Sequence, residues 1–354
     1  MHLPTYLTAS TARADDVAQQ PLVSVCIPNY NGMAVIDDCI QSVLAQKGDF
    51  GIEIVVHDDN SADSSLAHIC AAYPEVKVIK SAENVGFCVA NNRMAAVATG
   101  TYLLLLNNDA ALYPDAIRML LLEAQRLQQP AILSLPQHDA STGVLLDIGA
   151  RLDPFLNPVP NLDPTRNDVG MVAGACLWID KSLWEELGGF PPWFGSIGED
   201  LYLCCRARRW GYPVRALGVS GYRHHVGASF GGGKTQGGKL STSFRRRALS
   251  ECNKTFVMAM CYPTPAMQLM LPLHIALLLL EGMVLSLVLG NSAFWRQIYW
   301  PIVPALVRQR HELKATRSAI TSHTPPAKTR FFSAFNWLPH KLTMLLRHGL
   351  PTVR

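Results

Sequence analysis

The sequence has little charge and lacks the patterns that mark several common protein classes. Charged residues make up 16% of its 354 residues and hydrophobic residues 49%, which is typical of a globular protein with a leaning towards membranes, not of a disordered chain. The nine cysteines include no CxxC pair, which favours a reducing cytoplasm over a disulfide framework. No GxGxxG follows the first predicted strand, so a dinucleotide oxidoreductase is the least favoured of the functions considered. Residues 1–20 hold two acids and no apolar run, so we expect a flexible arm and no signal peptide.

Acidic residues are almost absent from the C-terminal part of the chain. From Asn291 to the end there are ten Lys or Arg and a single acid, Glu312. Residues 1–290 carry 21 bases and 26 acids and are mildly acidic. A basic tail that is also rich in aromatic residues predicts contact with an anionic surface.

Strands and helices alternate over the first half of the chain. We predict strands at 22–27, 52–56, 76–80 and 103–106, and helices at 35–46, 89–98 and 114–128. Residues 63–65 can cap a further helix that runs to about residue 72. This spacing predicts an α/β fold with a mostly parallel, doubly wound sheet. An irregular stretch over 134–170 is followed by a strand at 172–179, helices at 181–187 and 199–210, and a glycine-rich flap at 221–240. We expect a catalytic domain over 21–245 and a helical region over 246–354.

A carboxylate follows the most apolar of these strands. Leu103–Leu106 run directly into Asn107, Asn108 and Asp109. Open α/β sheets bind their ligands at the carboxyl ends of the strands, and Mg²⁺ and Mn²⁺ prefer carboxylate oxygen. Asp109 is therefore a candidate metal ligand next to a phosphate, and the alternative is a simple Asx turn.

Seven short blocks occur along the chain in a specific order. They are VSVCIPNYNG (23–32), IVVHDDNSADSS (54–65), ENVGFCVANN (83–92), LLLLNNDA (103–110), GACLWI (174–179), LGGFPPWFGSIGEDLYLCCRARRWGY (187–212) and HHVGAS (224–229). In this order they resemble the family 2 glycosyltransferases, and within them the bacterial rhamnosyltransferase-like branch. The resemblance implies the A-type glycosyltransferase fold, a nucleotide-sugar donor and inversion at the anomeric carbon.

The resemblance also assigns donor binding to residues near the strand ends, with Asp59 as the natural partner of a base N–H. The donor-binding candidates are Pro28, Asn29, Tyr30, Asp58, Asp59, Gly86, Phe87, Asn91, Asn107 and Asn108. Arg93 lies on the same predicted helix as Asn91. For these residues the alternatives are an ordinary strand-to-helix turn, helix capping and surface polarity.

Glu199 and Asp200 are the catalytic candidates. An inverting transfer needs a base for the acceptor hydroxyl, and the resemblance implies Asp200 for this role with Glu199 orienting the base or acceptor. Two adjacent carboxylates repel, which raises the pKa of one of them. The alternative is a helix N-terminus that carries acids for its dipole. A further acid common in the family is replaced by Tyr202, so an acceptor contact is expected to differ.

The metal motif is a degenerate form of the family's Asp-X-Asp, because only Asp109 remains. His224 and His225 are similar to a family motif near the diphosphate, and one of them is expected to bind the metal or phosphate. The cofactor predicted is Mg²⁺ or Mn²⁺. The glycines of the flap suit closure over a donor.

Residues 270–289 form a leucine-rich run long enough to cross a bilayer. Glu281 near its centre opposes insertion, and one span would place the ten-base tail outside, against the positive-inside rule. We therefore expect helices lying in the inner leaflet, with a buried helical subdomain as the alternative.

These observations predict a membrane-associated inverting glycosyltransferase at the cytoplasmic face of the inner membrane. It is expected to move a rhamnose-like or other hexose from a nucleotide-diphosphate donor to a glycan or lipid-linked acceptor in cell-surface polysaccharide assembly. The expected partners are the donor, the acceptor and the membrane surface, with no nucleic acid. The alternative is a catalytically weak sugar-nucleotide-binding or scaffold protein.

Overall fold

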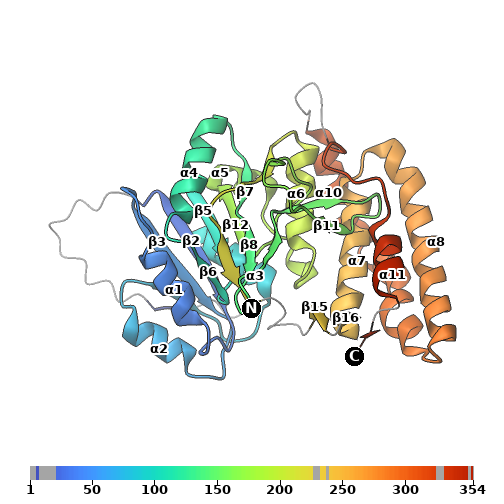
Figure 1. Ribbon diagram of the computed structural model, residues 1–354, viewed down its shortest axis with the longest axis horizontal. Helices are drawn as coiled ribbons and strands as arrows, with labels where there is room; N and C mark the ends of the chain where they lie inside the picture. The colour runs from blue at the N-terminus through green and yellow to red at the C-terminus, as the bar shows by residue number, and fades with distance from the viewer. Residues whose placement is uncertain are drawn as a thin grey trace.

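A computed structural model describes residues 5–7, 21–225, 232–236, 239–323, 331–349 and 352–353. Its largest element is an eight-stranded sheet (Figure 1). In spatial order the strands are β1 (Thr5–Leu7), β4 (Lys77–Lys80), β3 (Ile52–Asp58), β2 (Val23–Asn29), β5 (Tyr102–Leu106), β12 (Cys176–Asp180), β7 (Ile132–Ser134) and β13 (Val214–Ala216). Strands β4, β3, β2 and β5 are parallel, so the predicted α/β sheet is confirmed. Strand β12 runs antiparallel between β5 and β7, and β1 pairs antiparallel with β4, which gives residues 5–7 of the predicted arm a fixed place.

The leucines of β5 explain why this strand lies at the centre of the sheet. All four are completely buried, and they alternate between two cores. Leu103 and Leu105 join the core that contains residues of α3 (Phe87–Val97), α5 (Lys181–Leu187) and α6 (Glu199–Arg209). Leu104 and Leu106 join the opposite core, formed with α1 (Ile36–Leu44), α2 (Ser65–Ala72) and α4 (Ala116–Leu127). The helices thus cover both faces, as a doubly wound sheet requires.

Some element boundaries differ from those that the sequence predicts. Strand β2 continues through Pro28 to Asn29 instead of ending at residue 27. Pro28 is tolerated because β2 pairs with β5 only as far as Cys26, so no N–H is needed on that side. Helix α3 begins at Phe87, two residues earlier than expected, directly after Gly86 with its positive φ of 82°.

The stretch over 134–170, which the sequence predicts to be irregular, contains short strands. Strands β8 (Gln137–Asp139) and β9 (Leu145–Asp147) belong to a second sheet of order β6-β14-β8-β9, with β6 (Ala110–Leu112) and β14 (Tyr222–His224). Strands β10 (Ala150–Leu152) and β11 (Pro158–Pro160) form a separate pair. Strands of three residues are too short to show a period of two, which is why they were missed. The second sheet brings β14 beside the segment that follows Asp109.

The glycine-rich flap is described only in part. Strands β15 (Gly232–Gln236) and β16 (Lys239–Thr242) form a hairpin, to which β17 (Thr352–Val353) adds a third strand. Residues 226–231 and 237–238 of the predicted flap lie outside the described residues. They include the end of the HHVGAS block, residues 226–229.

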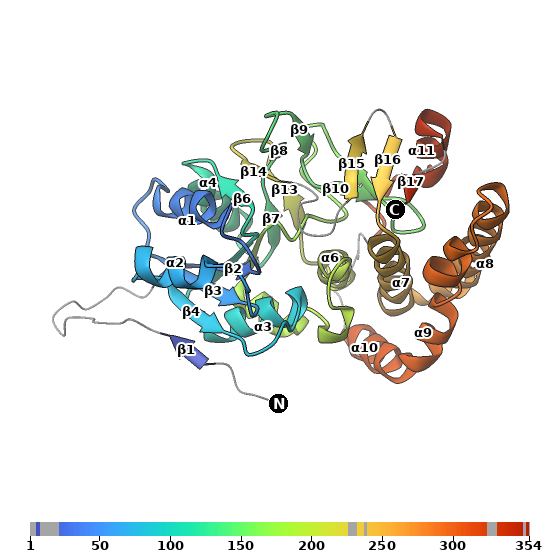
Figure 2. The same cartoon turned by 90° about the horizontal axis from the view of Figure 1, so that it is seen from below.

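The C-terminal region is helical. It consists of α7 (Phe244–Cys261), α8 (Thr264–Val288), the π-helical turn η2 (Phe294–Tyr299), α9 (Ile302–Arg308), α10 (Arg310–Ser322) and α11 (His340–His348). Helix α7 packs against α6 of the α/β body, and α8 lies on the outer side of α7 (Figure 2). The predicted boundary near residue 245 falls in the first turn of α7.

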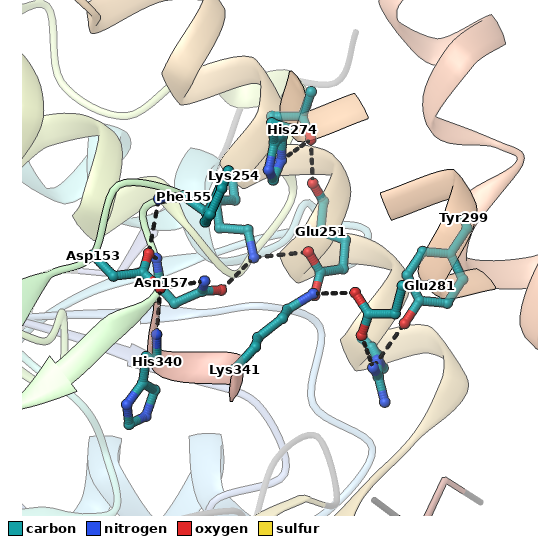
Figure 3. A network of polar contacts seen from close by, with 12 residues as sticks. Asp153, Phe155, Asn157, Glu251, Lys254, His274, Glu281, Tyr299, His340 and Lys341 are labelled. Carbon is teal, nitrogen blue, oxygen red and sulfur yellow. Dashed lines mark hydrogen bonds and ion pairs between the residues drawn. The ribbon is translucent and has the colours of Figure 1, made fainter. Parts of the chain in front are cut away.

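A buried network of charged and polar side chains joins these helices to the α/β body (Figure 3). The ammonium group of Lys254 lies 2.7 Å from a Glu251 carboxylate oxygen and donates a 2.6 Å hydrogen bond to Asn157. Lys341 of α11 bridges Glu251 and Glu281 at 2.6 and 2.7 Å. The network therefore connects α7, α8 and α11 to the loop before β11.

Candidate active site

The ends of β2, β3 and β5 meet at one edge of the sheet because these strands are parallel. The Asn29 side chain links all three ends. Its Nδ2 donates to Asp58 Oδ1 at 3.0 Å and to Ser65 Oγ at 3.0 Å, and its Oδ1 accepts from Asn108 Nδ2 at 3.1 Å. Asn29 and Asp58 are about 1% exposed. Among the predicted donor-binding residues, Asn29, Asp58 and Asn108 therefore hold the three strand ends together through their side chains.

Asp59 shapes the neighbouring turn. Its two carboxylate oxygens accept hydrogen bonds from the backbone N–H groups of Val85 and Gly86, at 2.7 and 2.9 Å. Burial raises the pKa of Asp59, and the two N–H donors oppose that rise. Gly86 brings the backbone close to Gly195, whose carbonyl oxygen would lie 3.4 Å from a Cβ at position 86. Asp59 and Gly86 are thus brought together, and the contact of Asp59 with a base N–H stays a prediction.

The other predicted donor residues differ in how they face the edge. Tyr30 is 53% exposed immediately after β2, while Pro28 is partly buried. Phe87 stacks on Phe190 with a centroid distance of 6.1 Å. Asn91 is fully buried and donates to the Phe87 carbonyl of its own helix, and its Oδ1 has no hydrogen-bond partner among the described residues.

Arg93, on the same helix, lies 3.3 Å from Nε2 of the buried His57 and donates to Ser81. Burial, with the nearby Arg93, lowers the pKa of His57 to about 4, so this histidine is neutral. The guanidinium group of Arg93 is thus already bonded to protein side chains, those of His57 and Ser81.

Asp109 and His224 face one another across the two sheets. Nε2 of His224 lies 3.1 Å from Oδ1 of Asp109, and both side chains are largely buried. Oδ1 of Asp109 and Nδ1 of His224 have no hydrogen-bond partner among the described residues, and neither does Oδ1 of Asn107. His225 contributes its backbone N–H, which donates to the Asp109 carbonyl at 3.0 Å. His224, of the two histidines, is therefore the one placed beside Asp109.

This donor set fits a divalent cation that is completed by ligands from outside the protein. In the described part of the chain no group of three or more His, Cys, Asp or Glu side chains is placed to hold a metal ion. The two available atoms are Oδ1 of Asp109 and Nε2 of His224, which lie 3.1 Å apart, and this pair suits Mg²⁺ or Mn²⁺ with diphosphate oxygens and water in the remaining positions.

Glu199 and Asp200 begin α6 and occupy different environments. Glu199 is buried and its Oε2 has no hydrogen-bond partner among the described residues, whereas Asp200 is partly exposed. The Asp200 carboxylate accepts from the N–H groups of Gly174 at 3.1 Å and Leu201 at 2.7 Å. Its orientation is therefore fixed while one side remains open.

Both carboxyl groups are easier to protonate than usual. Burial, followed by repulsion from Asp200, raises the pKa of Glu199 to about 8. Burial also raises the pKa of Asp200, against its two N–H donors. The predicted carboxylate repulsion raises the pKa of Glu199, and Asp200 is the more exposed member of the pair.

Two residues of α7 at this site were not predicted from the sequence. The guanidinium group of Arg246 acts electrostatically on both Glu199 and Asp200 and favours their charged forms. Asn253 donates to the carbonyls of Phe194, Ser196 and Ile197 and so fixes the loop before α6. The signal available was the run of three arginines at 245–247 that follows the glycine-rich segment.

The two halves of the site are joined through the residues just before β12. The Asn107 N–H donates to the Ala175 carbonyl at 3.0 Å, and the adjacent Gly174 donates to Asp200. Asp109 and Asp200 both also act electrostatically on the buried Tyr222. The metal candidate and the base candidate are therefore linked through the hydrogen bonds of the adjacent residues Gly174 and Ala175.

Glu199→Gln is expected to flatten the pH dependence of stability. Folded Glu199 keeps its proton up to about pH 8, whereas the unfolded chain releases it above about pH 4.5, so the free energy of unfolding of the natural chain falls as pH rises between these values. The slope from this group is at most about 1.4 kcal/mol per pH unit. Urea denaturation across this pH range measures it, with the exposed Glu185→Gln as control. Equal slopes in the natural chain and Glu199→Gln would show that Glu199 is ionised when folded.

The sheet order and the site at its carboxyl edge define an A-type glycosyltransferase fold. Residues 24–187 match the family model described as Glycosyl transferase family 2. The O-antigen biosynthesis protein RfbC of Myxococcus xanthus is 26% identical over 225 residues, which are 59% of this chain and 18% of that protein. The chain spans about a third or less of the curated relatives it matches first.

Solved structures show the same fold. The structure of GalNAc-T7 with UDP, GalNAc and Mn²⁺ has a TM-score of 0.54 and 18% identity, and covers 69% of this chain and 48% of that one. The structure of S. aureus TarS 1-349 in complex with UDP-GlcNAc has a TM-score of 0.53 and 16% identity, and covers 85% and 89%. At these identities the likeness establishes the fold alone.

Proposed function

We propose that this protein is an inverting glycosyltransferase that moves a hexose from a nucleotide-diphosphate donor to a hydroxyl of a glycan or lipid-linked glycan during cell-surface polysaccharide assembly. The observation that carries the proposal is the joined pair of carboxylates. Asp109 faces His224 at the strand ends, and the partly exposed Asp200 is connected to it through Gly174 and Ala175. A scaffold protein without activity would not need an oriented, open carboxylate beside a cation site.

In this proposal Asp200 takes the proton of the acceptor hydroxyl as its oxygen attacks the anomeric carbon. The bond from that carbon to the donor phosphate breaks on the opposite face, and the electron pair leaves with the nucleoside diphosphate. Arg246 favours the ionised form of Asp200, and buried Glu199 holds the position next to it. Tyr30 and the turn at Val85–Gly86 are proposed to border the nucleoside, with Tyr30 presenting an exposed ring for stacking.

A divalent cation held by Asp109 and His224 would neutralise the leaving diphosphate. UDP is the first donor nucleotide to test, because the structures of GalNAc-T7 and TarS were determined with UDP or UDP-GlcNAc. The rhamnosyltransferase-like branch is part of the proposal, supported by the order of the seven blocks. The free cysteines throughout the described residues support placement on the cytoplasmic side of the inner membrane.

Asp109→Ala is expected to weaken UDP binding by about tenfold or more in the presence of Mn²⁺, because an anionic ligand of the cation is lost. With EDTA the difference from the natural chain should shrink. Calorimetric titration with UDP, with and without metal, measures both effects. The exposed Asp49→Ala serves as control for a lost surface carboxylate. An identical metal response in Asp109→Ala and the natural chain would show that Asp109 is not a metal ligand.

The function is tested by a panel of nucleotide sugars that includes UDP-GlcNAc, UDP-GalNAc and dTDP-rhamnose. Release of nucleoside diphosphate and the anomeric configuration of the product, followed by NMR, report the donor and the stereochemistry. An inverted product from one of these donors supports the proposal. Tight nucleotide-sugar binding with no release from any donor, in the presence of membrane extracts as acceptor source, would favour the scaffold alternative.

A further inference from the structure

Helix α8 carries two different stripes along its length. The inner stripe is buried and contains His274, Leu278, Gly282 and Leu285. Gly282 lies so close to the Tyr299 ring that a Cβ would approach it to 2.7 Å. The outer stripe consists of large apolar side chains that are 42% to 82% exposed. They are Leu269, Leu273, Leu277, Leu280, Met283, Val284, Leu287 and Val288. An exposed row of this length marks an interaction surface.

The acid in the middle of α8 is directed inwards. Glu281 is paired with Arg247 of α7 and Lys341 of α11, each at 2.7 Å (Figure 3). His274 is also buried, stacks on Phe155 and contacts Thr255 at 3.0 Å. The polar groups of α8 are thus used inside the protein, and its outer stripe is apolar without interruption by charge.

Exposed apolar side chains continue on the neighbouring α11, which is tied to α8 through Lys341. Leu342, Leu345 and Leu346 are exposed there, as are Trp337 and Leu338 just before it and Trp300 after η2. We call these residues, together with the outer stripe of α8, the apolar face. Length and composition alone would allow α8 to cross a bilayer. Its inner stripe, however, is already covered by α7 and η2, so only one side is available for lipid.

The exposed charges of the helical region are mostly basic. Arg296, Arg308, Arg310, Lys314 and Arg347 are exposed in the same helical region. From Tyr262 to the end of the chain there are only two acids, the paired Glu281 and the exposed Glu312. A second copy of the chain would bring like charges together, whereas an anionic lipid surface complements them.

We propose that the apolar face docks on an anionic membrane, with α8 lying in one leaflet parallel to the surface and not crossing it. Apolar side chains enter the boundary between headgroups and acyl chains, and the surrounding Arg and Lys side chains meet the phosphates. Docking of this kind needs no nucleotide and no turnover, so its failure and the failure of the proposed transfer reaction are distinguishable.

The test is flotation of the full chain with vesicles of phosphatidylcholine alone and with added phosphatidylserine. We expect binding to the vesicles that contain phosphatidylserine, at least about tenfold weaker binding to neutral ones, and release by alkaline carbonate. The variant Leu273→Glu/Leu280→Glu/Leu287→Glu should lose at least about nine-tenths of the binding. The matched control Leu122→Glu/Val144→Glu changes two exposed apolar residues of the α/β body and should bind as the natural chain does. UDP titration and circular dichroism verify that each variant is folded.

Four results would overturn the proposal. They are the absence of vesicle binding by the natural chain, equal binding to neutral and anionic vesicles, equal loss in the control variant, and retention of the natural chain in membranes after carbonate extraction. The last of these would show a spanning helix. Loss of a dimer in the triple variant, measured by light scattering, together with no vesicle binding, would assign the apolar face to a second copy of the chain.

Discussion

Asp200→Asn is expected to lower the turnover number by about a thousandfold, because the loss of a general base costs on the order of 10² to 10⁴ in rate. The asparagine side chain has the same shape, and its oxygen can still accept from Gly174 or Leu201, so donor affinity should change by less than about threefold. Steady-state kinetics with the donor found in the nucleotide-sugar panel, together with calorimetry of UDP binding, separates the two effects. Asp49→Asn, on an exposed turn, is the control.

A turnover number of Asp200→Asn close to that of the natural chain would remove Asp200 from the role of base. A joint loss of turnover and of UDP binding would instead show that Asp200 organises the donor site. If Glu199→Gln alone caused the thousandfold loss with normal pH-dependent stability, the two carboxylates would have to exchange roles.

Lys254→Met is expected to lower the free energy of unfolding by about 3 kcal/mol, the lower end of the range for breaking a buried ion pair. Lys254 is 4% exposed and contacts both Glu251 and Asn157. The loss is moderated because Lys341 still lies 2.6 Å from Glu251. Urea denaturation of the full chain measures the effect, and the exposed Lys47→Met is the control.

The double variant Glu251→Met/Lys254→Met should recover part of this loss, because it removes both members of the pair and leaves Lys341 with Glu281. A Lys254→Met chain as stable as the natural one would show that Lys254 is not ionised in the folded protein. A change in the denaturant slope, instead of the midpoint, would indicate that the helical region unfolds separately.

Long apolar segments made the core of the fold predictable. The run Leu103–Leu106 is buried on both faces, so its strand and the position of Asp109 after it followed directly from the sequence. The helix at 181–187 was also predicted with the bounds that the structure shows, because Gly188 provides a left-handed C-cap. The adjacent acids at 199–200 were found because they stand together at a helix start.

Contacts between distant segments were not predictable from one sequence. The direction of β12 depends on the 41-residue connection from β7, which leaves no local pattern. Asn29 and Asp58 stand where ligand-binding residues are expected, yet their side chains bond to each other across 29 positions. Arg246 reaches the carboxylates only because α7 packs on α6, and nothing in the arginine run specifies which of its three members faces inwards.

The bond from Lys254 to Asn157 has a consequence for how the protein is oriented. It connects helix α7, and through Glu251 and Lys341 helices α8 and α11, to a loop of the domain that carries the candidate active site. Rotation of the outer helices relative to the sheet would break buried ion pairs, so the two parts are expected to move as one body. On a membrane, the apolar face would then set both the height and the angle at which Asp200 stands above the lipid. Acceptor hydroxyls carried at that height would be within reach of Asp200. The length of the carrier and glycan would therefore determine which acceptors are used.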